Sequence, residues 1–305
     1  MKNIFASLLT LALLTLVTGC KGGDKGGGDK GGGDKAPAGD AAKAEASTPP
    51  GGGNALTIKG SDTMVILGQQ WAESFMKANP DQRIQVTGGG SGTGIAALLN
   101  GTTEIAMSSR AIKPAEAQQV QARHKVQARE TAVARDGVTF YVHESNPVRA
   151  LSLDQLQAIY LGDVKNWKEV GGPDARIVVY SRENSSGTYV FVKDEVLKGE
   201  DFTSDALTLP GTAAVVNAVA KEKHGIGFGG SAYGKGIREL AVKVGNEEVA
   251  PSEANIQTGL YPLSRDLFFY TRGEPSGEAK TFIDFALSVE GQAIVTKVGY
   301  FPLKK

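Results

Sequence analysis

Residues 84–99 read Ile-Gln-Val-Thr-Gly-Gly-Gly-Ser-Gly-Thr-Gly-Ile-Ala-Ala-Leu-Leu. The apolar, β-branched positions of 84–86 predict a strand, and the apolar run of 95–99 predicts a helix. Between them lies a loop, 88–94, that contains only glycine, serine and threonine. A strand, a glycine-rich loop and a helix in this order form the repeating unit of α/β proteins.

The same unit recurs along the chain. Residues 64–78 predict a helix, because Leu67, Trp71 and Phe75 fall on one face. Ser152 and Gln155 form a capping box that opens another helix. Further strands are predicted at 56–58, 105–107, 138–142, 177–180, 226–228 and 267–270, and further helices at 188–197 and from about 281 and 288. The alternation predicts an α/β fold with mainly parallel sheets flanked by helices, and the length favours two domains.

The first twenty residues have the pattern of a targeting signal. The apolar run of 4–17 is shorter than the roughly 20 residues that a membrane-spanning helix needs. A lysine before it and small residues after it predict a secretory signal peptide over 1–19. Residues 17–20, Val-Thr-Gly-Cys, resemble the bacterial lipobox, which implies that Cys20 carries the lipid. Cys20 is the only cysteine, so an intrachain disulfide is excluded.

Residues 20–54 predict a disordered tether. They repeat Lys-Gly-Gly-Gly-Asp and contain no aromatic or large aliphatic residue. Such a segment cannot bury enough apolar surface to offset the entropy of ordering it. We expect it to act as a spacer between a membrane and the folded part.

Net charge and residue types exclude several classes of function. Lysine plus arginine and aspartate plus glutamate both number 33, which argues against gripping nucleic acid through a positive field. The three histidines lack the spacing of a zinc motif. We therefore expect no metal and no cofactor.

Three polar, glycine-containing loops each precede a predicted helix, at 60–63, 88–94 and 182–188. A helix start offers unpaired N–H groups and the positive end of the helix dipole, and serine and threonine add hydroxyl donors. Ordinary helix capping explains any one such loop. Three of them at the carboxyl ends of strands predict an anion-binding site.

Enzyme motifs fail at the same loops. The segment 89–93 lacks the last glycine of a nucleophile elbow. The spacing of 89–94 matches a P-loop, but Ile95 stands where the lysine belongs. A phosphatase or phosphotransferase is therefore the remote alternative, and we expect a binding protein without catalytic activity.

An ordered series of motifs resembles the phosphate-binding protein family of bacterial phosphate ABC transporters, the PstS family. The resemblance covers roughly residues 55–305. It rests on the segments 60–64, 88–94, 106–110, 135–138, 159–172, 181–188, 288–295 and 298–300.

The resemblance implies a type II periplasmic-binding-protein fold, with two lobes joined by a hinge of crossing strands. We place the crossings near 138–142 and 260–267, so the first lobe comprises 55–138 and 263–305 and the second 139–262. It also implies a monomer that binds inorganic phosphate and delivers it to a permease. With Cys20 lipidated, the protein would sit on the extracytoplasmic face of the bacterial cell envelope.

The family motifs place the phosphate contacts at Ser61, Asp62, Thr63, Ser91, Ser109, Arg182, Ser186, Gly187 and Thr188. Many members have an aspartate after the strand that matches 105–107, where it accepts the proton of phosphate. Here that position is Ser109, followed by Arg110, which could share the site or serve packing.

A proton acceptor matters because phosphate can donate a hydrogen bond to a carboxylate and sulfate cannot. A site built for such a bond can reject the analogue that lacks it by about 10⁴–10⁵. Asp62 is our first candidate for this role and Asp136 the second. Binding of another tetrahedral oxyanion such as sulfate, or phosphate sensing without transport, remains open.

Overall fold

The computed structural model describes residues 55–303. The predicted signal peptide 1–19, the lipid attachment at Cys20 and the tether 20–54 lie outside the described residues. Within 55–303, none of the helices combines the length and the apolar character needed to cross a membrane.

One half of the described chain is built around a parallel three-stranded unit. Strand β1 lies between β2 and β3 and is parallel to both, and β11 adds antiparallel to β3. The strands are β1 (Leu56–Gly60), β2 (Ile84–Thr87), β3 (Ile105–Ser108) and β11 (Ser264–Arg272). The helices are α1 (Val65–Ala78), α2 (Ser91–Asn100), α3 (Pro114–His124), α8 (Gly277–Leu287) and α9 (Val289–Val298).

The other half continues the sheet in the order β4-β8-β6-β7 and adds a small group of strands around β9. The strands are β4 (Ala128–Val142), β5 (Ala150–Ser152), β6 (Val178–Arg182), β7 (Leu207–Leu209), β8 (Gly225–Gly230), β9 (Arg238–Val244) and β10 (Glu247–Val249). The helices are α4 (Leu153–Leu161), α5 (Gly187–Glu195), α6 (Gly211–Val219), α7 (Glu253–Thr258) and the short 3₁₀ turns η1 (Trp167–Val170) and η2 (Ser231–Tyr233).

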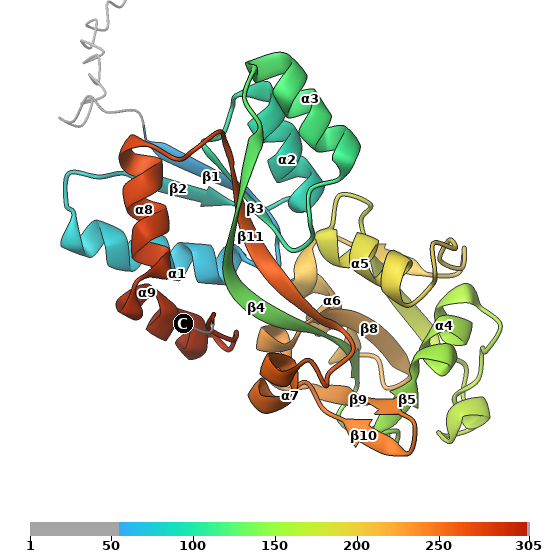
Figure 1. The fold of residues 1–305 in the computed structure, drawn as a ribbon. Coiled ribbons are helices and arrows are strands. Elements are labelled where there is room, and N and C mark those ends of the chain that lie inside the picture. Colours follow the sequence, from blue (N-terminus) through green and yellow to red (C-terminus); the bar gives the residue numbers. More distant parts are fainter. Residues whose placement is uncertain (1–54, 304–305) are drawn as a thin grey trace, which may run out of the picture. The chain divides into compact units, whose positions relative to one another are not determined.

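Two long strands, β4 and β11, connect the halves. They run side by side from one half into the other (Figure 1). Residues 128–137 of β4 pair with β11, whereas residues 138–142 pair with β8 and β9. The predicted strand 138–142 is thus the last third of a longer strand.

Each half has its own apolar interior. The first core gathers side chains of β1, β3, α1, α8 and α9, with Trp71 fully buried and its indole N–H donated to the Gly291 carbonyl at 2.8 Å. The second core gathers side chains of β4, β6, β8, α4 and α5, with Trp167 fully buried and its indole N–H donated to the His224 carbonyl at 2.9 Å. Because the two hydrophobic cores are separate, polar loops can occupy the region between them.

The predicted α/β architecture is confirmed, but the sheets are mixed rather than mainly parallel. Of the ten strand pairings among the described residues, five are parallel and five antiparallel. Four of the antiparallel pairings involve β4 or β11, because a strand that crosses between halves runs against the strands it joins. The strand that precedes each predicted glycine loop, β1, β2 and β6, makes only parallel pairings.

Candidate functional site

The first loop follows β1 and leads into α1. Ser61 and Thr63 are buried, whereas Asp62 between them is partly exposed. The Ser61 hydroxyl donates to the Ser109 hydroxyl at 3.0 Å. The Tyr300 hydroxyl donates to the Thr63 carbonyl and ties this loop to the end of α9. The loop is therefore held from two sides.

The second loop follows β2 and ends where α2 begins, at the buried Ser91. The Ser91 hydroxyl accepts the Ser109 N–H at 3.0 Å. Gly90 has φ 92°, and a Cβ there would lie 2.5 Å from the Ser185 carbonyl oxygen. Only glycine therefore lets this loop approach the third loop so closely.

The third loop follows β6 and opens α5. The Ser186 hydroxyl caps the helix by accepting the Tyr189 N–H at 3.2 Å. Thr188 shares a hydrogen bond with Thr63 across 3.0 Å. A Cβ on Gly187 would lie 2.3 Å from the Ser91 hydroxyl oxygen, so the start of α5 faces the start of α2. The structure thus brings all three predicted loops together.

The meeting place of the loops is a cluster of hydroxyl groups. Its six members are buried and come from both halves of the described chain: Ser61, Thr63, Ser91, Ser109, Ser186 and Thr188. The α2 and α5 starts add backbone N–H groups and the positive ends of two helix dipoles. Such a set of donors around one point suits a small oxyanion.

Arg182 supplies the positive charge. Its side chain is 1% exposed. One terminal nitrogen donates to the Thr212 hydroxyl and the other to the Asp62 carboxylate, both at 2.8 Å. The Nε atom is buried without a hydrogen-bond partner among the described residues. Burial lowers the pKa of Arg182, and the nearby Asp62 charge opposes that shift. A buried guanidinium with a free donor is a strong sign of an anion site.

Asp62 belongs to the first loop and connects it to the second and third loops. One carboxylate oxygen accepts the Gly89 N–H at 2.8 Å, and the other accepts the Arg182 bond. The Tyr233 hydroxyl donates to the Asp62 carbonyl at 2.8 Å. The N-cap position of α1 is Met64, and the Asp62 carboxylate instead makes contacts that join the loops.

Arg265 is a member of the site region that sequence reasoning missed. It lies on β11 and donates to the Asp136 carboxylate at 2.8 Å and to the Thr188 hydroxyl at 3.0 Å. Asp136 is fully buried, and its Oδ1 atom has no hydrogen-bond partner among the described residues. Burial raises the pKa of Asp136, against the charge of Arg265. No local motif marks Arg265, because only the pairing of β11 with β4 brings it to the loops. Thr212 was also missed, because it lies on α6, outside the three predicted loops.

Arg110 is turned toward α3. Its two terminal nitrogens donate to the two carboxylate oxygens of Glu116 at 2.8 and 2.7 Å. Its Nε has no partner among the described residues. It lines a cavity of about 330 Å³ that also borders Phe191 and Arg265. Arg110 therefore flanks the hydroxyl cluster and makes no hydrogen bond to it.

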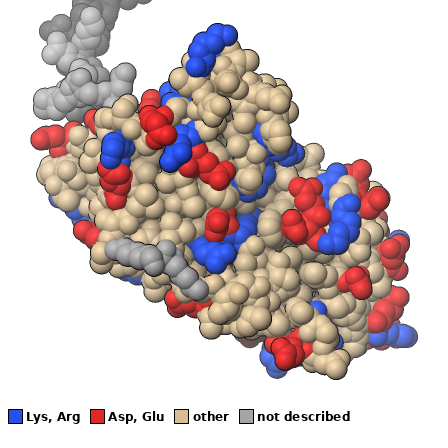
Figure 2. Space-filling view, viewed as in Figure 1, with Lys and Arg blue, Asp and Glu red and all other residues tan. Residues whose placement is uncertain are grey.

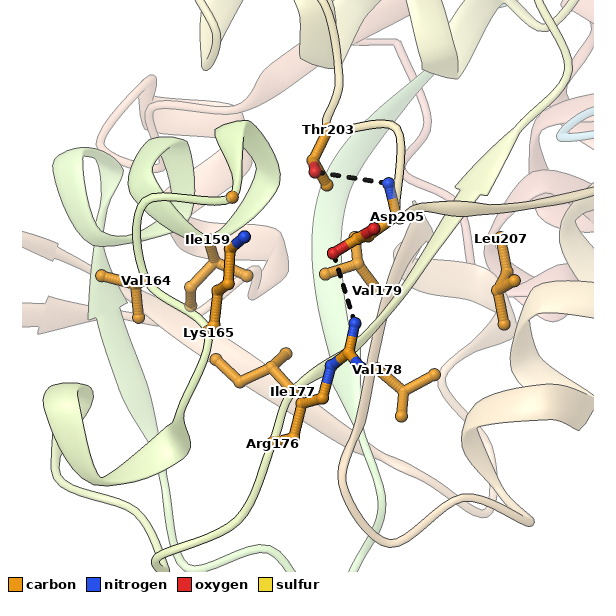
Figure 3. A pocket seen from close by; sticks show the side chains of 11 residues that line it. Ile159, Val164, Lys165, Arg176, Ile177, Val178, Val179, Thr203, Asp205 and Leu207 are labelled. Atoms are coloured by element: carbon orange, nitrogen blue, oxygen red, sulfur yellow. Dashed lines mark hydrogen bonds and ion pairs between the residues drawn. The ribbon is translucent and has the colours of Figure 1, made fainter.

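A cavity of about 240 Å³ lies elsewhere, at the start of β6 (Figure 3). Its lining is mainly apolar, with Ile159, Ile177 and Val179 among the side chains drawn, and Arg176 pairs with Asp205 at 3.2 Å on its rim. Arg182 stands at the other end of the same strand. This cavity has no counterpart to the converging hydroxyls and helix starts, so the loops are the better candidate for an anion site.

Surface charge on the face drawn in Figure 2 is mixed in sign. Basic and acidic side chains are interspersed over the face seen in Figure 2, without a large region of one sign. Across residues 55–303 no group of three or more histidine, cysteine, aspartate or glutamate side chains could hold a metal ion. This face therefore offers no basic patch that could replace the loops as a candidate anion site.

Comparisons with known proteins point to one family. Residues 41–290 match the family model described as "PBP superfamily domain". The phosphate-binding protein PstS of Pseudomonas aeruginosa is 34% identical over 284 residues, which cover 87% of this chain and 88% of that protein. The PstS protein of Bacillus subtilis is 34% identical over 265 residues, which cover 87% of this chain and 84% of that protein.

The chain belongs to the PstS family of phosphate-binding proteins.

Solved structures of related phosphate-binding proteins share the fold of this chain. A putative phosphate ABC transporter substrate-binding protein with bound phosphate, from Clostridium perfringens, aligns with a TM-score of 0.76 at 33% identity. That alignment covers 82% of this chain and 100% of that chain. An ABC-type phosphate transport receptor from Vibrio cholerae aligns with a TM-score of 0.67 at 29% identity, over 81% of this chain and 100% of that chain. The type II periplasmic-binding-protein fold predicted for this PstS family member is thereby confirmed.

Proposed function

We propose that this protein binds inorganic phosphate between its two cores and delivers it to the permease of an ABC transporter. One observation carries the proposal: buried Arg182 has a free Nε donor and pairs with Asp62 of the first loop, where three loops and Ser109 gather six buried hydroxyl groups. A tetrahedral oxyanion satisfies such donors from several directions at once. The relatives named phosphate-binding protein PstS, and the related structures titled a phosphate ABC transporter substrate-binding protein with bound phosphate and a phosphate transport receptor, support the same conclusion for this chain.

The proposed phosphate contacts lie on the three loops and at Ser109. The first half of the described chain would contribute Ser61, Asp62 and Thr63 from the first loop, Ser91 at the start of α2 and Ser109 after β3. The second half would contribute Arg182, Ser186, Gly187 and Thr188 from the third loop. Their burial and mutual distances support this assignment. Closing the site removes water, which strengthens every charge-assisted bond to the anion.

The carboxylate that recognises the phosphate proton is proposed to be Asp62. It contacts Arg182 directly, whereas Asp136 reaches the loops only through Arg265. Asp136 stays the second candidate, because its Oδ1 is buried and free. Replacing each by asparagine and comparing phosphate with sulfate affinity separates them. Loss of selectivity in Asp62→Asn alone supports Asp62, and loss in Asp136→Asn alone assigns the role to Asp136.

The two cores are proposed to be lobes that open and close about the crossing strands β4 and β11. The proposed bounds are 55–138 with 263–305 for the first lobe and 139–262 for the second. Several polar contacts join the two sides, among them Asp62 with Arg182, Thr63 with Thr188, and the Gly92 N–H with the Ser185 carbonyl at 2.9 Å. Polar contacts of this kind can exchange partners with water when the lobes part.

The cellular setting completes the proposal. A signal peptide over 1–19 and a lipid on Cys20 would hold the protein, as a monomer, at the extracytoplasmic face of a bacterial membrane. Labelling with a radioactive fatty acid tests the anchor, because Cys20→Ala would abolish the label. Label retained in Cys20→Ala would contradict it.

Calorimetric titration tests the binding function. We expect phosphate to bind tightly, arsenate to bind as an analogue, and sulfate to give no heat beyond dilution. A phosphatase assay on the same sample should show no turnover. Equal binding of sulfate would favour a general oxyanion receptor, and no binding of phosphate would refute the proposal.

A further inference from the structure

Arg265 stands at the place where the two crossing strands pass the binding loops. It lies on β11 directly opposite Asp136 of β4. Its side chain is 4% exposed, and that of Asp136 is fully buried. None of the sequence motifs of the family resemblance includes Arg265. A buried arginine outside the loops therefore needs its own explanation.

The guanidinium group of Arg265 contacts residues of both halves of the described chain. It donates from Nε and one terminal nitrogen to Asp136 Oδ2, at 3.1 and 2.8 Å. The other terminal nitrogen donates to the Ser109 carbonyl at 3.0 Å, on the side of the first core. The Thr188 hydroxyl accepts a further bond at 3.0 Å, on the side of the second core.

An aromatic ring on the second core adds a further contact. The Arg265 guanidinium carbon lies 5.3 Å from the centre of the Phe191 ring, which belongs to α5 like Thr188. Cations attract aromatic rings at this distance. Arg265 thus has two contacts on α5, one polar and one with a ring, and both end if α5 moves away.

We propose that Arg265 is a positioning residue: it fixes the third loop against the first core in the closed arrangement and so slows the release of phosphate. The inference rests on the proposed function and goes beyond it, because Arg265 acts through Thr188 and Ser109. Asp136 holds the guanidinium on the strands, and the remaining donors reach the two loops.

The chemistry of arginine is needed for this role. A planar fork with five N–H donors can serve Asp136, Ser109 and Thr188 at the same time. Lysine keeps the charge and can still pair with Asp136, but its single ammonium group cannot span the three acceptors or stack on Phe191. Opening the cleft breaks the bond to Thr188 and uncovers the ring, so the contacts oppose dissociation more than association.

The experiment is stopped-flow measurement of phosphate association and dissociation by the full chain. We expect Arg265→Lys to raise the dissociation rate constant by about ten-fold or more, with the association rate constant within about three-fold of wild type. Phe191→Leu should raise the dissociation rate constant roughly two- to five-fold. Arg265→Met should raise the dissociation rate constant more than either of these variants. If Arg265→Met does not fold, Arg265→Lys decides the test.

The matched control is Arg135→Lys. Arg135 lies one position before Asp136 on β4, pairs with Asp266 of β11 and touches no binding loop in the described contacts. We expect wild-type rate constants for it. An unchanged dissociation rate in Arg265→Lys, beside a wild type that binds phosphate, would overturn this inference alone. A wild type that binds no phosphate would overturn the proposed function and this inference together.

Discussion

Strands β4 and β11 carry two arginine–aspartate pairs at successive positions of their register, here called rungs. The arginine lies on β4 in one pair and on β11 in the other. Arg135 of β4 faces Asp266 of β11, and Asp136 of β4 faces Arg265 of β11. The first pair is 29% and 41% exposed, whereas the second is 4% exposed at Arg265 and 0% at Asp136. The bond lengths are similar, 3.0 and 2.8 Å. Successive residues of a strand point to opposite faces, so the same chemistry meets water on one side and the binding loops on the other.

The comparison teaches that burial decides what an ion pair does. An exposed pair gains little, because water screens the charges and the side chains lose entropy. A buried pair costs desolvation, and losing one member leaves the other charge stranded. The stability of the protein should therefore be much more sensitive to substitutions in the buried pair than in the exposed pair.

The largest effect is expected from Asp136→Ala. It leaves Arg265 buried without its anion, so the free energy of unfolding should fall by about 3–5 kcal/mol. Urea denaturation measures the loss. The same truncation on the exposed rung, Asp266→Ala, is the control. Equal losses in the two variants would remove the contrast between the rungs.

A second buried arginine sharpens the comparison through ligand binding. Arg182→Ala removes the buried guanidinium whose Nε is free, and we expect phosphate affinity to fall by more than about 100-fold, or about 3 kcal/mol. Calorimetry measures the affinity. Arg176→Ala, on the rim of the separate cavity, should leave it unchanged. A comparable loss in both variants would show that the effect is general.

Glu239 shows a third case, a half-buried carboxylate whose buried Oε1 atom has no hydrogen-bond partner among residues 55–303. Burial, and next the charge of Asp136, raise the pKa of Glu239 to about 7. The folded protein then holds a proton that the unfolded chain releases near its ordinary pKa of 4.5. The stabilisation is full below that value and is lost as the pH rises through about 7.

Glu239→Gln should remove this pH dependence. Between pH 5 and pH 8 we expect the unfolding free energy of the wild type to fall by about 2 kcal/mol relative to the variant. Urea melts at both pH values give the difference. Parallel profiles for the two proteins would exclude a raised pKa at this position.

The smallest effect is expected from Arg135→Ala. The exposed pair should contribute less than about 1 kcal/mol to stability, and added salt should shrink that contribution further. Thermal melts at low and high ionic strength measure it. A loss as large as that of Asp136→Ala would mean that strand position matters more than exposure.

Local patterns explain which parts could be predicted from the sequence. The helix over 64–78 was predictable because its apolar face repeats at helical spacing, and the loops because glycine and hydroxyl residues mark helix starts. Helix α3 was not predicted, since Val120 is its only buried residue and the rest is proline, alanine and polar residues without an apolar face. The first two thirds of β4 were missed for a similar reason: charged residues 129, 130, 135 and 136 obscure the alternation.

Non-local pairing explains what the sequence could not show. Arg182 was predictable because it stands within a loop motif. Arg265 and Asp136 lie 129 positions apart and meet only through the register of β4 with β11. Asp266 and Arg265 are adjacent charges in the sequence, and only the fold tells which of them is buried. Asp136 could be named from its motif, but its buried partner Arg265 could be found only from tertiary structure, whereas site residues on loops have a local signature.

The two tryptophans give this protein a built-in pair of optical reporters. Trp71 lies in the first core and Trp167 in the second, and the sequence contains no others. Both are fully buried, so the emission of each shifts to the red when its own core lets water in. Replacing one or the other by phenylalanine would yield two proteins that each report the melting of a single core. A shared midpoint would mark one cooperative unit, and two midpoints would show which side of the cleft gives way first.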